Sequence, residues 1–174
     1  MSAITYLDAL RKALKDVMEP FIPTIPMSVY FGADALINSC ELKTFVVQNA
    51  PRVVIGGQPN ELYTLVMIDP DVPNPNAPHL GQLISWIVTN IPGGASCTQG
   101  TEIMPYVGPN PQIGVHRYIL FLYQQQARLD DIDAIESRFH FNVEDFANRH
   151  NMGNPVGLSY FNVRRQANGR NANA

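Results

Sequence analysis

The chain has 174 residues, of which 45% are hydrophobic, and a formal net charge of -3. This length and apolar content are sufficient for one domain with a full hydrophobic core, which we predict over residues 1–163. The weak negative charge excludes a general electrostatic attraction to nucleic acid or anionic membranes. Residues 164–174 are rich in Asn, Gly and Ala, and are predicted to form a disordered tail.

Cysteine content and hydropathy exclude several further classes of protein. Cys40 and Cys97 are too few for a disulfide framework, and the His and Cys residues lack the spacing of a metal site. Charged residues interrupt the N-terminal segment, so no leader peptide is expected. No apolar run reaches the roughly 20 residues of a membrane span. We therefore expect a soluble, intracellular protein without a metal ion or cofactor.

The N-terminal segment has the periodicity of a helix. Leu7, Leu10 and Leu14 recur at a spacing of three to four residues, which predicts an amphipathic helix over residues 5–18 that ends before Pro20. Its polar face mixes Arg and Lys with Asp, whereas helices that lie on membranes are mainly basic. The helix is therefore expected to pack on the outside of a sheet.

From residue 27 the apolar period changes to two. Strands are predicted at residues 28–31, 44–47, 52–55, 63–68, 85–89, 116–123 and 157–163. Many short strands without alternating helices indicate a mainly β fold, an antiparallel Greek-key β-sandwich with a few short peripheral helices. One such helix is predicted at residues 143–150, between an Asn142 cap and Gly153. Residues 126–141 form an external loop, either solvated or in contact with another protein.

Polar side chains stand at the ends of two of these strands. Asp69 and Asp71 follow the strand at residues 63–68, and His116 opens the strand at residues 116–123. Two carboxylates and an imidazole predict a small polar pocket at one end of the sheet, although a lone histidine is more often structural. A buried carboxylate needs a cation or hydrogen-bond donors beside it, because an unpaired buried charge is costly. We expect Asp69 to face the pocket and Asp71 to brace it, with Arg117, on the other side of the strand, as the ion-pair partner.

Several motifs resemble the phosphatidylethanolamine-binding protein family. They are Asp-Pro-Asp-Val-Pro at residues 69–73, Trp-Ile-Val-Thr-Asn-Ile-Pro-Gly-Gly at 86–94, Tyr-Val-Gly-Pro at 106–109 and Gly-Val-His-Arg-Tyr at 114–118. The resemblance extends from about residue 16 to about residue 163 and keeps the motif order. Within the family, the chain is most similar to the plant flowering-time branch and its mother-of-flowering-time-like subgroup. The family fold is a β-sandwich with a few peripheral helices, which agrees with the strand pattern.

The resemblance implies a pocket for a phosphate-bearing small ligand or a phospholipid head group. In the family the histidine at the position of His116 contacts this anion, and a cis bond often precedes the proline at the position of Pro73. The implied ligand-binding residues are Asp69, Asp71, Pro73, Ser85, Tyr106, Gly108, Pro109, His116 and Tyr118. Ser85 stands where a second pocket histidine is expected, and Gly81-Gln82 replaces an Arg-Glu pair. We therefore expect weaker or altered anion binding.

The resemblance also implies protein partners. Members of the florigen type bind 14-3-3 proteins and, through them, bZIP transcription factors, which predicts a cytoplasmic and nuclear monomer without direct contact to nucleic acid. Pro92 and Arg128 match positions of that contact surface, whereas Asn60 and Gln99 replace an arginine and a phenylalanine. Arginine and aromatic residues are common hot spots of protein interfaces, so the absence of these two side chains weakens the prediction of 14-3-3 binding. Leu83 replaces the residue that separates floral promoters from repressors.

Three functions remain open from the sequence. The leading hypothesis is a non-enzymatic signalling regulator. A hydrolase could use Asp69, Asp71 and His116 for acid–base chemistry, but no Ser or Cys lies in a nucleophile motif. Inhibition of a protease or kinase through exposed loops or the N-terminal segment is the third possibility.

Overall fold

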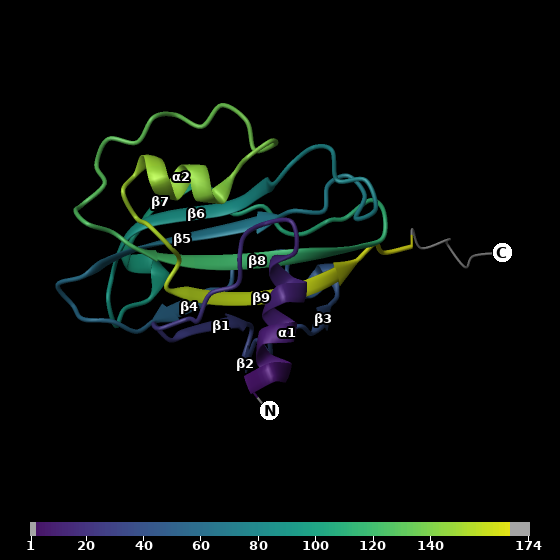
Figure 1. Cartoon of the computed structure of the whole chain (residues 1–174), viewed down its shortest axis with the longest axis horizontal. Coiled ribbons are helices and arrows are strands. Elements are labelled where there is room, and N and C mark those ends of the chain that lie inside the picture. The colour runs from purple at the N-terminus through teal and green to yellow at the C-terminus, as the bar shows by residue number, and fades with distance from the viewer. Residues whose placement is uncertain (1–2, 168–174) are drawn as a thin grey trace.

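The computed structural model describes residues 3–167, which form a mainly β structure with two α-helices (Figure 1). The helices are α1 (Ala3–Leu14) and α2 (Val143–Arg149), and two short 3-10 helices are η1 (Thr44–Val46) and η2 (Cys97–Gln99). The strands are β1 (Met27–Phe31), β2 (Asp34–Ala35), β3 (Glu41–Leu42), β4 (Arg52–Ile55), β5 (Leu62–Asp69), β6 (Leu83–Pro92), β7 (Thr101–Met104), β8 (Val115–Gln124) and β9 (Gly157–Arg164).

These strands form two sheets. The small sheet has the order β2-β1-β4, and the large sheet has the order β3-β9-β8-β5-β6-β7. Strand β5 is central in the large sheet, where Val66 lies opposite Ile87 on β6 and Phe121 on β8. The pairs within both sheets are antiparallel except for β3 and β9, which are parallel.

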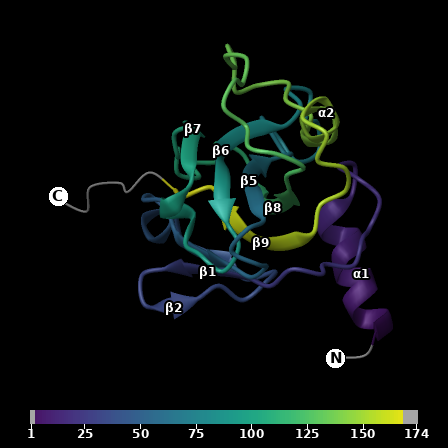
Figure 2. The same ribbon diagram turned by 90° about the vertical axis from the view of Figure 1, so that its left-hand side faces the viewer.

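The large sheet is covered on both faces. Along β5, Val66 and Ile68 belong to the apolar cluster that includes residues of α1 and α2, whereas Leu65 and Met67 belong to the cluster shared with the small sheet. Figure 2 shows the small sheet below the large sheet, α2 above the large sheet and α1 beside β9. Successive side chains of a strand point to opposite faces, so a strand covered on both faces is apolar at nearly every position. This explains the continuous apolar runs in the sequence.

Most of the strand predictions are confirmed. The segments at residues 28–31, 52–55, 63–68, 85–89, 116–123 and 157–163 lie within β1, β4, β5, β6, β8 and β9. The strand predicted at residues 44–47 is wrong, because this segment forms η1, exposes 79% of Phe45 and buries Val47. The short strands β2, β3 and β7 were missed, and the parallel β3–β9 pair departs from a purely antiparallel sheet. The Greek-key order of connections stays a prediction.

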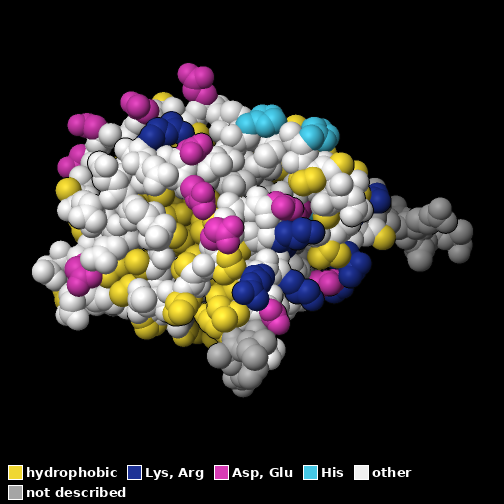
Figure 3. Space-filling view, viewed as in Figure 1, with side chains coloured by type: hydrophobic (Ala, Val, Ile, Leu, Met, Phe, Trp, Pro, Cys, Tyr) yellow, Lys and Arg dark blue, Asp and Glu magenta, His cyan; other side chains and the backbone are white. Residues whose placement is uncertain are grey.

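The helix predictions are confirmed in position, with one difference in length. Helix α1 ends at Leu14 rather than at residue 18 because Asp16 has a left-handed backbone with φ of 62°. Helix α2 begins after Asn142, whose side chain accepts the N–H of Asp145 at 3.0 Å. No helix within residues 3–167 is long and apolar enough to cross a membrane. Figure 3 shows both acidic and basic side chains on the face that carries α1.

The C-terminal prediction needs a correction. Arg164 does not begin a disordered tail, because it closes β9 and its Nε lies 3.0 Å from Oε1 of Glu41. The N–H of Arg165 also donates to the carbonyl of Gly114 at 2.9 Å. Residues 168–174 of the predicted tail lie outside the described residues.

A buried polar network fixes the start of the external loop. Oε1 of Gln125 accepts the Thr64 hydroxyl at 2.7 Å and the Asn90 N–H at 2.8 Å, and its Nε2 donates to Oδ1 of Asn90 at 2.9 Å. The Asn90 side chain also accepts the N–H of Leu129 at 2.9 Å and donates to its carbonyl at 2.8 Å. The loop therefore leaves the sheet in a fixed position.

We expect Gln125→Ala to lower the free energy of unfolding by about 2–4 kcal/mol, because buried polar groups of Thr64 and Asn90 lose their partners. Urea unfolding at equilibrium measures this change. The neighbouring Gln126 is exposed, and Gln126→Ala should change stability by less than about 0.5 kcal/mol. Equal stability of the two variants would contradict the role of the network.

Candidate functional site

A cavity of about 350 Å³ lies at the end of the large sheet where β5 ends and β6 and β8 begin, on the right in Figure 1. Its lining from the strands comprises Asp69, Leu83, Ile84, Ser85, His116 and Tyr118. Loops contribute Val72, Pro73, Leu80, residues 107–112, Arg138 and Phe139. Two of these, Arg138 and Phe139, belong to the far end of the external loop.

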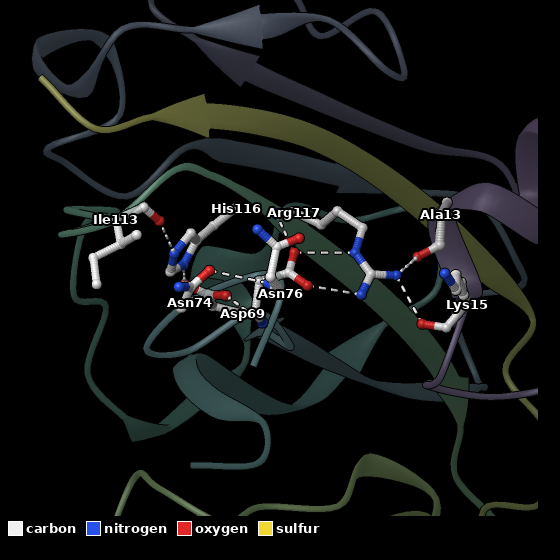
Figure 4. A network of polar contacts seen from close by, with 9 residues as sticks. Ala13, Lys15, Asp69, Asn74, Asn76, Ile113, His116 and Arg117 are labelled. Atoms are coloured by element: carbon white, nitrogen blue, oxygen red, sulfur yellow. Dashed lines mark hydrogen bonds and ion pairs between the residues drawn. The ribbon is translucent and has the colours of Figure 1, made fainter. Parts of the chain in front are cut away.

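An ion pair between Asp69 and His116 forms the polar floor of this cavity (Figure 4). Oδ2 of Asp69 lies 2.7 Å from Nδ1 of His116, and both side chains are only 1% exposed. Nε2 of the same ring lies 2.8 Å from the carbonyl oxygen of Ile113. Both neighbours are acceptors, so both ring nitrogens donate, and this requires the imidazolium form.

These contacts explain the pKa shifts of His116 and Tyr118 at the floor of the cavity. Burial alone lowers the pKa of His116, but the hydrogen bond and the charge of Asp69 outweigh it, and the net shift is upward. Burial, followed by the charge of Asp69, raises the pKa of the Tyr118 phenol. A carboxylate and an imidazolium therefore form a neutral pair beside an uncharged phenol.

Asp71 and Arg117 form a second pair directed away from the cavity. Oδ2 of Asp71 accepts Nε of Arg117 at 3.0 Å and its backbone N–H at 2.8 Å, while Oδ1 accepts NH2 at 2.8 Å. The guanidinium also donates to the carbonyls of Ala13 at 3.0 Å and Lys15 at 2.8 Å, at the end of α1 (Figure 4). This geometry matches the expected division between a pocket-facing Asp69 and a bracing Asp71.

The structure brings together most of the residues predicted to form the pocket. The predicted residues that line the cavity are Asp69, Pro73, Ser85, Gly108, Pro109, His116 and Tyr118. The cis bond that the resemblance implies is present between Val72 and Pro73. Asp71 does not line the cavity.

Tyr106, which the resemblance implies as a ligand-binding residue, is not among the residues that line the cavity. Its hydroxyl donates to the carbonyl of Val47 at 2.7 Å, and its ring packs edge-on against Trp86 with 5.5 Å between the centroids. Both contacts pack this side chain against the core between the sheets.

Arg138 and Phe139 are lining residues that the sequence analysis did not assign to the site. NH1 of Arg138 donates to the carbonyls of Ile84 at 3.1 Å and Ser85 at 3.3 Å, and NH2 donates to that of Pro105 at 2.7 Å. Within residues 3–167, no carboxylate forms an ion pair with this guanidinium.

In the sequence, Gly81 could have indicated that Arg138 and Phe139 form one wall of the cavity. Its φ is +68°, and a Cβ there would lie 2.9 Å from Cα of His140. Glycine therefore allows residues 138–141 to lie along residues 80–84, where the N–H of Ile84 donates to the carbonyl of Arg138 at 2.9 Å. The adjacent Gln82 holds the next element, since its Oε1 accepts the first N–H of α2, from Val143, at 2.8 Å.

The predicted partner-binding residues lie at the opposite end of the sheet. Pro92 ends β6 opposite Leu62 at the start of β5, and the N–H of Gln125 donates to the Leu62 carbonyl at 2.8 Å. Arg128 follows closely along the chain and is 60% exposed, with Nε 2.8 Å from Oδ1 of Asp130. The cavity and this surface are therefore separated by the length of β5.

Comparison with known proteins agrees with this architecture. A family model described as phosphatidylethanolamine-binding protein matches residues 30–161. The chain belongs to the phosphatidylethanolamine-binding protein family. It is 38% identical over 157 residues to the rice protein MOTHER of FT and TFL1 homolog 2, covering 89% of this chain and 90% of the relative. It is 41% identical over 160 residues to TERMINAL FLOWER 1 of Arabidopsis thaliana, covering 91% and 90%.

FLOWERING LOCUS T of the same plant is 40% identical over 157 residues, covering 90% of this chain and 89% of the relative. Solved structures share this fold. A carboxypeptidase Y inhibitor, solved with its cognate proteinase, has a TM-score of 0.82 at 21% identity, with 94% of this chain and 97% of the inhibitor covered. The phosphatidylethanolamine-binding protein from Plasmodium vivax has a TM-score of 0.75 at 21% identity, covering 92% and 97%.

We expect Arg117→Ala to lower the free energy of unfolding by about 3 kcal/mol, because it leaves the buried Asp71 carboxylate without its partner. Thermal and urea unfolding measure the change. Arg11→Ala removes an exposed pair with Asp8 and should cost less than about 1 kcal/mol. An Arg117→Ala protein with the stability of the wild type would refute the bracing role.

The Asp69–His116 pair predicts a pH dependence of stability. The pKa of His116 is raised in the folded state, so its contribution is fully present below the unfolded value of about 6.5 and is lost as the pH rises through the folded value. Unfolding in urea between about pH 6 and pH 9 should show this loss. His116→Gln should abolish it, whereas His140→Gln, at an exposed position, should preserve it. The same pH profile in both variants would count against this assignment.

Proposed function

We propose that this chain is a non-enzymatic developmental regulator that acts by binding other proteins and carries a small anion in its cavity. The observation that carries this proposal is the similarity to plant proteins named for flowering, over about nine-tenths of both chains. A 14-3-3 protein, and through it a bZIP transcription factor, are the proposed partners, which implies action in the cytoplasm and nucleus.

The geometry of the cavity supports a binding role over hydrolysis. A general base must have a nitrogen or oxygen that can take up a proton from the reacting group. Both nitrogens of His116 already donate to Asp69 and to the Ile113 carbonyl, so the ring cannot accept a proton from Ser85. The likeness to a carboxypeptidase Y inhibitor concerns the fold alone and does not favour protease inhibition.

The charges around the cavity support an anionic ligand. The Asp69–His116 pair is neutral as a unit, and Asp71 is neutralised by Arg117. Arg138 adds a positive charge to the wall. A phosphate group or the head group of a phospholipid has the charge that this wall favours.

The proposed partner is tested by a calorimetric titration of this protein with a plant 14-3-3 protein. We expect micromolar binding that Arg128→Ala weakens about tenfold, as for a moderate hot-spot residue. Arg128 and Asp130 are both mostly exposed, so the variant should fold normally. Arg11→Ala, an exposed arginine on α1, is the matched control and should bind as the wild type does. Absence of binding would overturn the proposed partner.

A further inference from the structure

The polar groups on the cavity floor are already committed to one another. Asp69 uses Oδ2 for His116 and Oδ1 for the Asp71 N–H, which lies 2.8 Å away. His116 uses its second nitrogen for the Ile113 carbonyl. A ligand would have to break one of these buried bonds to contact the imidazole, and an unpaired buried polar group is costly.

Ser85 differs from these residues. It is only 3% exposed and lines the cavity, and within residues 3–167 its hydroxyl neither forms a hydrogen bond nor is among the fully buried unpaired atoms, so it opens onto the cavity. A hydroxyl group that opens onto a cavity wall and forms no hydrogen bond within the protein is suited to contact a ligand. Arg138 lies on the same cavity and makes three hydrogen bonds to carbonyls. A guanidinium has five N–H donors, so two remain for a ligand.

The rest of the cavity is apolar. Its walls include Val72, Leu80, Leu83 and Ile84, and its rim carries Val107 and Phe139. Val107 is 53% exposed and Phe139 is 46% exposed, although both are large and apolar. Inorganic phosphate would leave these surfaces in water, whereas an apolar group on the ligand would cover them.

We propose that the cavity binds an organic anion with an apolar body, such as an aryl carboxylate or an aryl phosphate ester. Ser85 and Arg138, rather than His116, contact the anionic head, and Leu83, Val107 and Phe139 hold the body. This inference deepens the proposed anion binding and rests on it. The volume of about 350 Å³ is near the lower limit of ligand pockets, which suits one ring and a head group.

The test compares anions that carry an apolar body with anions that lack one. Calorimetric titrations use inorganic phosphate, phosphoethanolamine as the head group of a lipid, phenyl phosphate, and phenylacetate. We expect the two aromatic anions to bind at least about tenfold more tightly than phosphate or phosphoethanolamine, because only they bury apolar surface. The uncharged 2-phenylethanol should bind more weakly than phenylacetate, because it lacks the charge that Arg138 favours.

Variants then locate the binding site. Ser85→Ala should weaken phenylacetate about three- to tenfold and leave stability unchanged or raised, since the hydroxyl has no partner to lose. Phe139→Ser should weaken both aromatic anions by at least about threefold through lost apolar contact. Ile37→Ser changes another exposed apolar residue, 76% exposed and outside the cavity lining, and should have no effect.

Three results would overturn the inference. Equal affinity for phosphate and the aromatic anions would show that the negative charge alone determines the affinity, which would overturn the inference but leave the proposed general anion binding intact. Binding that is insensitive to both Ser85→Ala and Phe139→Ser would place the ligand elsewhere. If none of the four anions binds, the cavity is not a site for organic anions. The 14-3-3 titration is made without any ligand, so it tests the proposed role as a regulator separately.

Discussion

Two acid–base pairs join the end of β5 to the start of β8, and the rest of the site depends on them. Asp69 with His116 and Asp71 with Arg117 are mostly buried, and such charges are tolerated only when each is paired and hydrogen-bonded. Asp69 and Asp71 are two residues apart, so the same short backbone segment positions both pairs. One pair forms the cavity floor, and the other ties the sheet to the end of α1.

This arrangement separates the stability of the site from its recognition of a ligand. The imidazole of His116 holds Asp69 and the Ile113 carbonyl in place, so the proposed contacts with a ligand fall to Ser85 on β6 and to side chains from loops, such as Arg138. Gly81 enables this, because it allows residues 138–141 to lie along residues 80–84, and Gln82 accepts the first N–H of α2. These are the two positions at which the resemblance implies an Arg-Glu pair, and here they hold glycine and glutamine.

The external loop connects the two ends of the large sheet. Its start is fixed by Gln125 and Asn90 near the surface that carries Arg128, and its end supplies Arg138 and Phe139 to the cavity. The two candidate surfaces therefore belong to one chain segment, although β5 separates them. The proposed protein partner and the proposed small ligand would therefore bind at opposite ends of the sheet without overlapping.

The sequence by itself determined the strongly periodic elements, the family and the presence of two acids and a histidine at strand ends. Those features are local, because the period of apolar residues and a motif are written in consecutive positions. Only the tertiary structure decided that residues 44–47 turn, that Tyr106 faces the core, and that Arg138 lines the cavity. Each of these depends on a partner distant in sequence, such as the carbonyl of Val47 for Tyr106 or that of Ser85 for Arg138. Local pattern does not name such partners, because hydrogen bonds and packing between distant segments are settled only when the sheets and loops assemble.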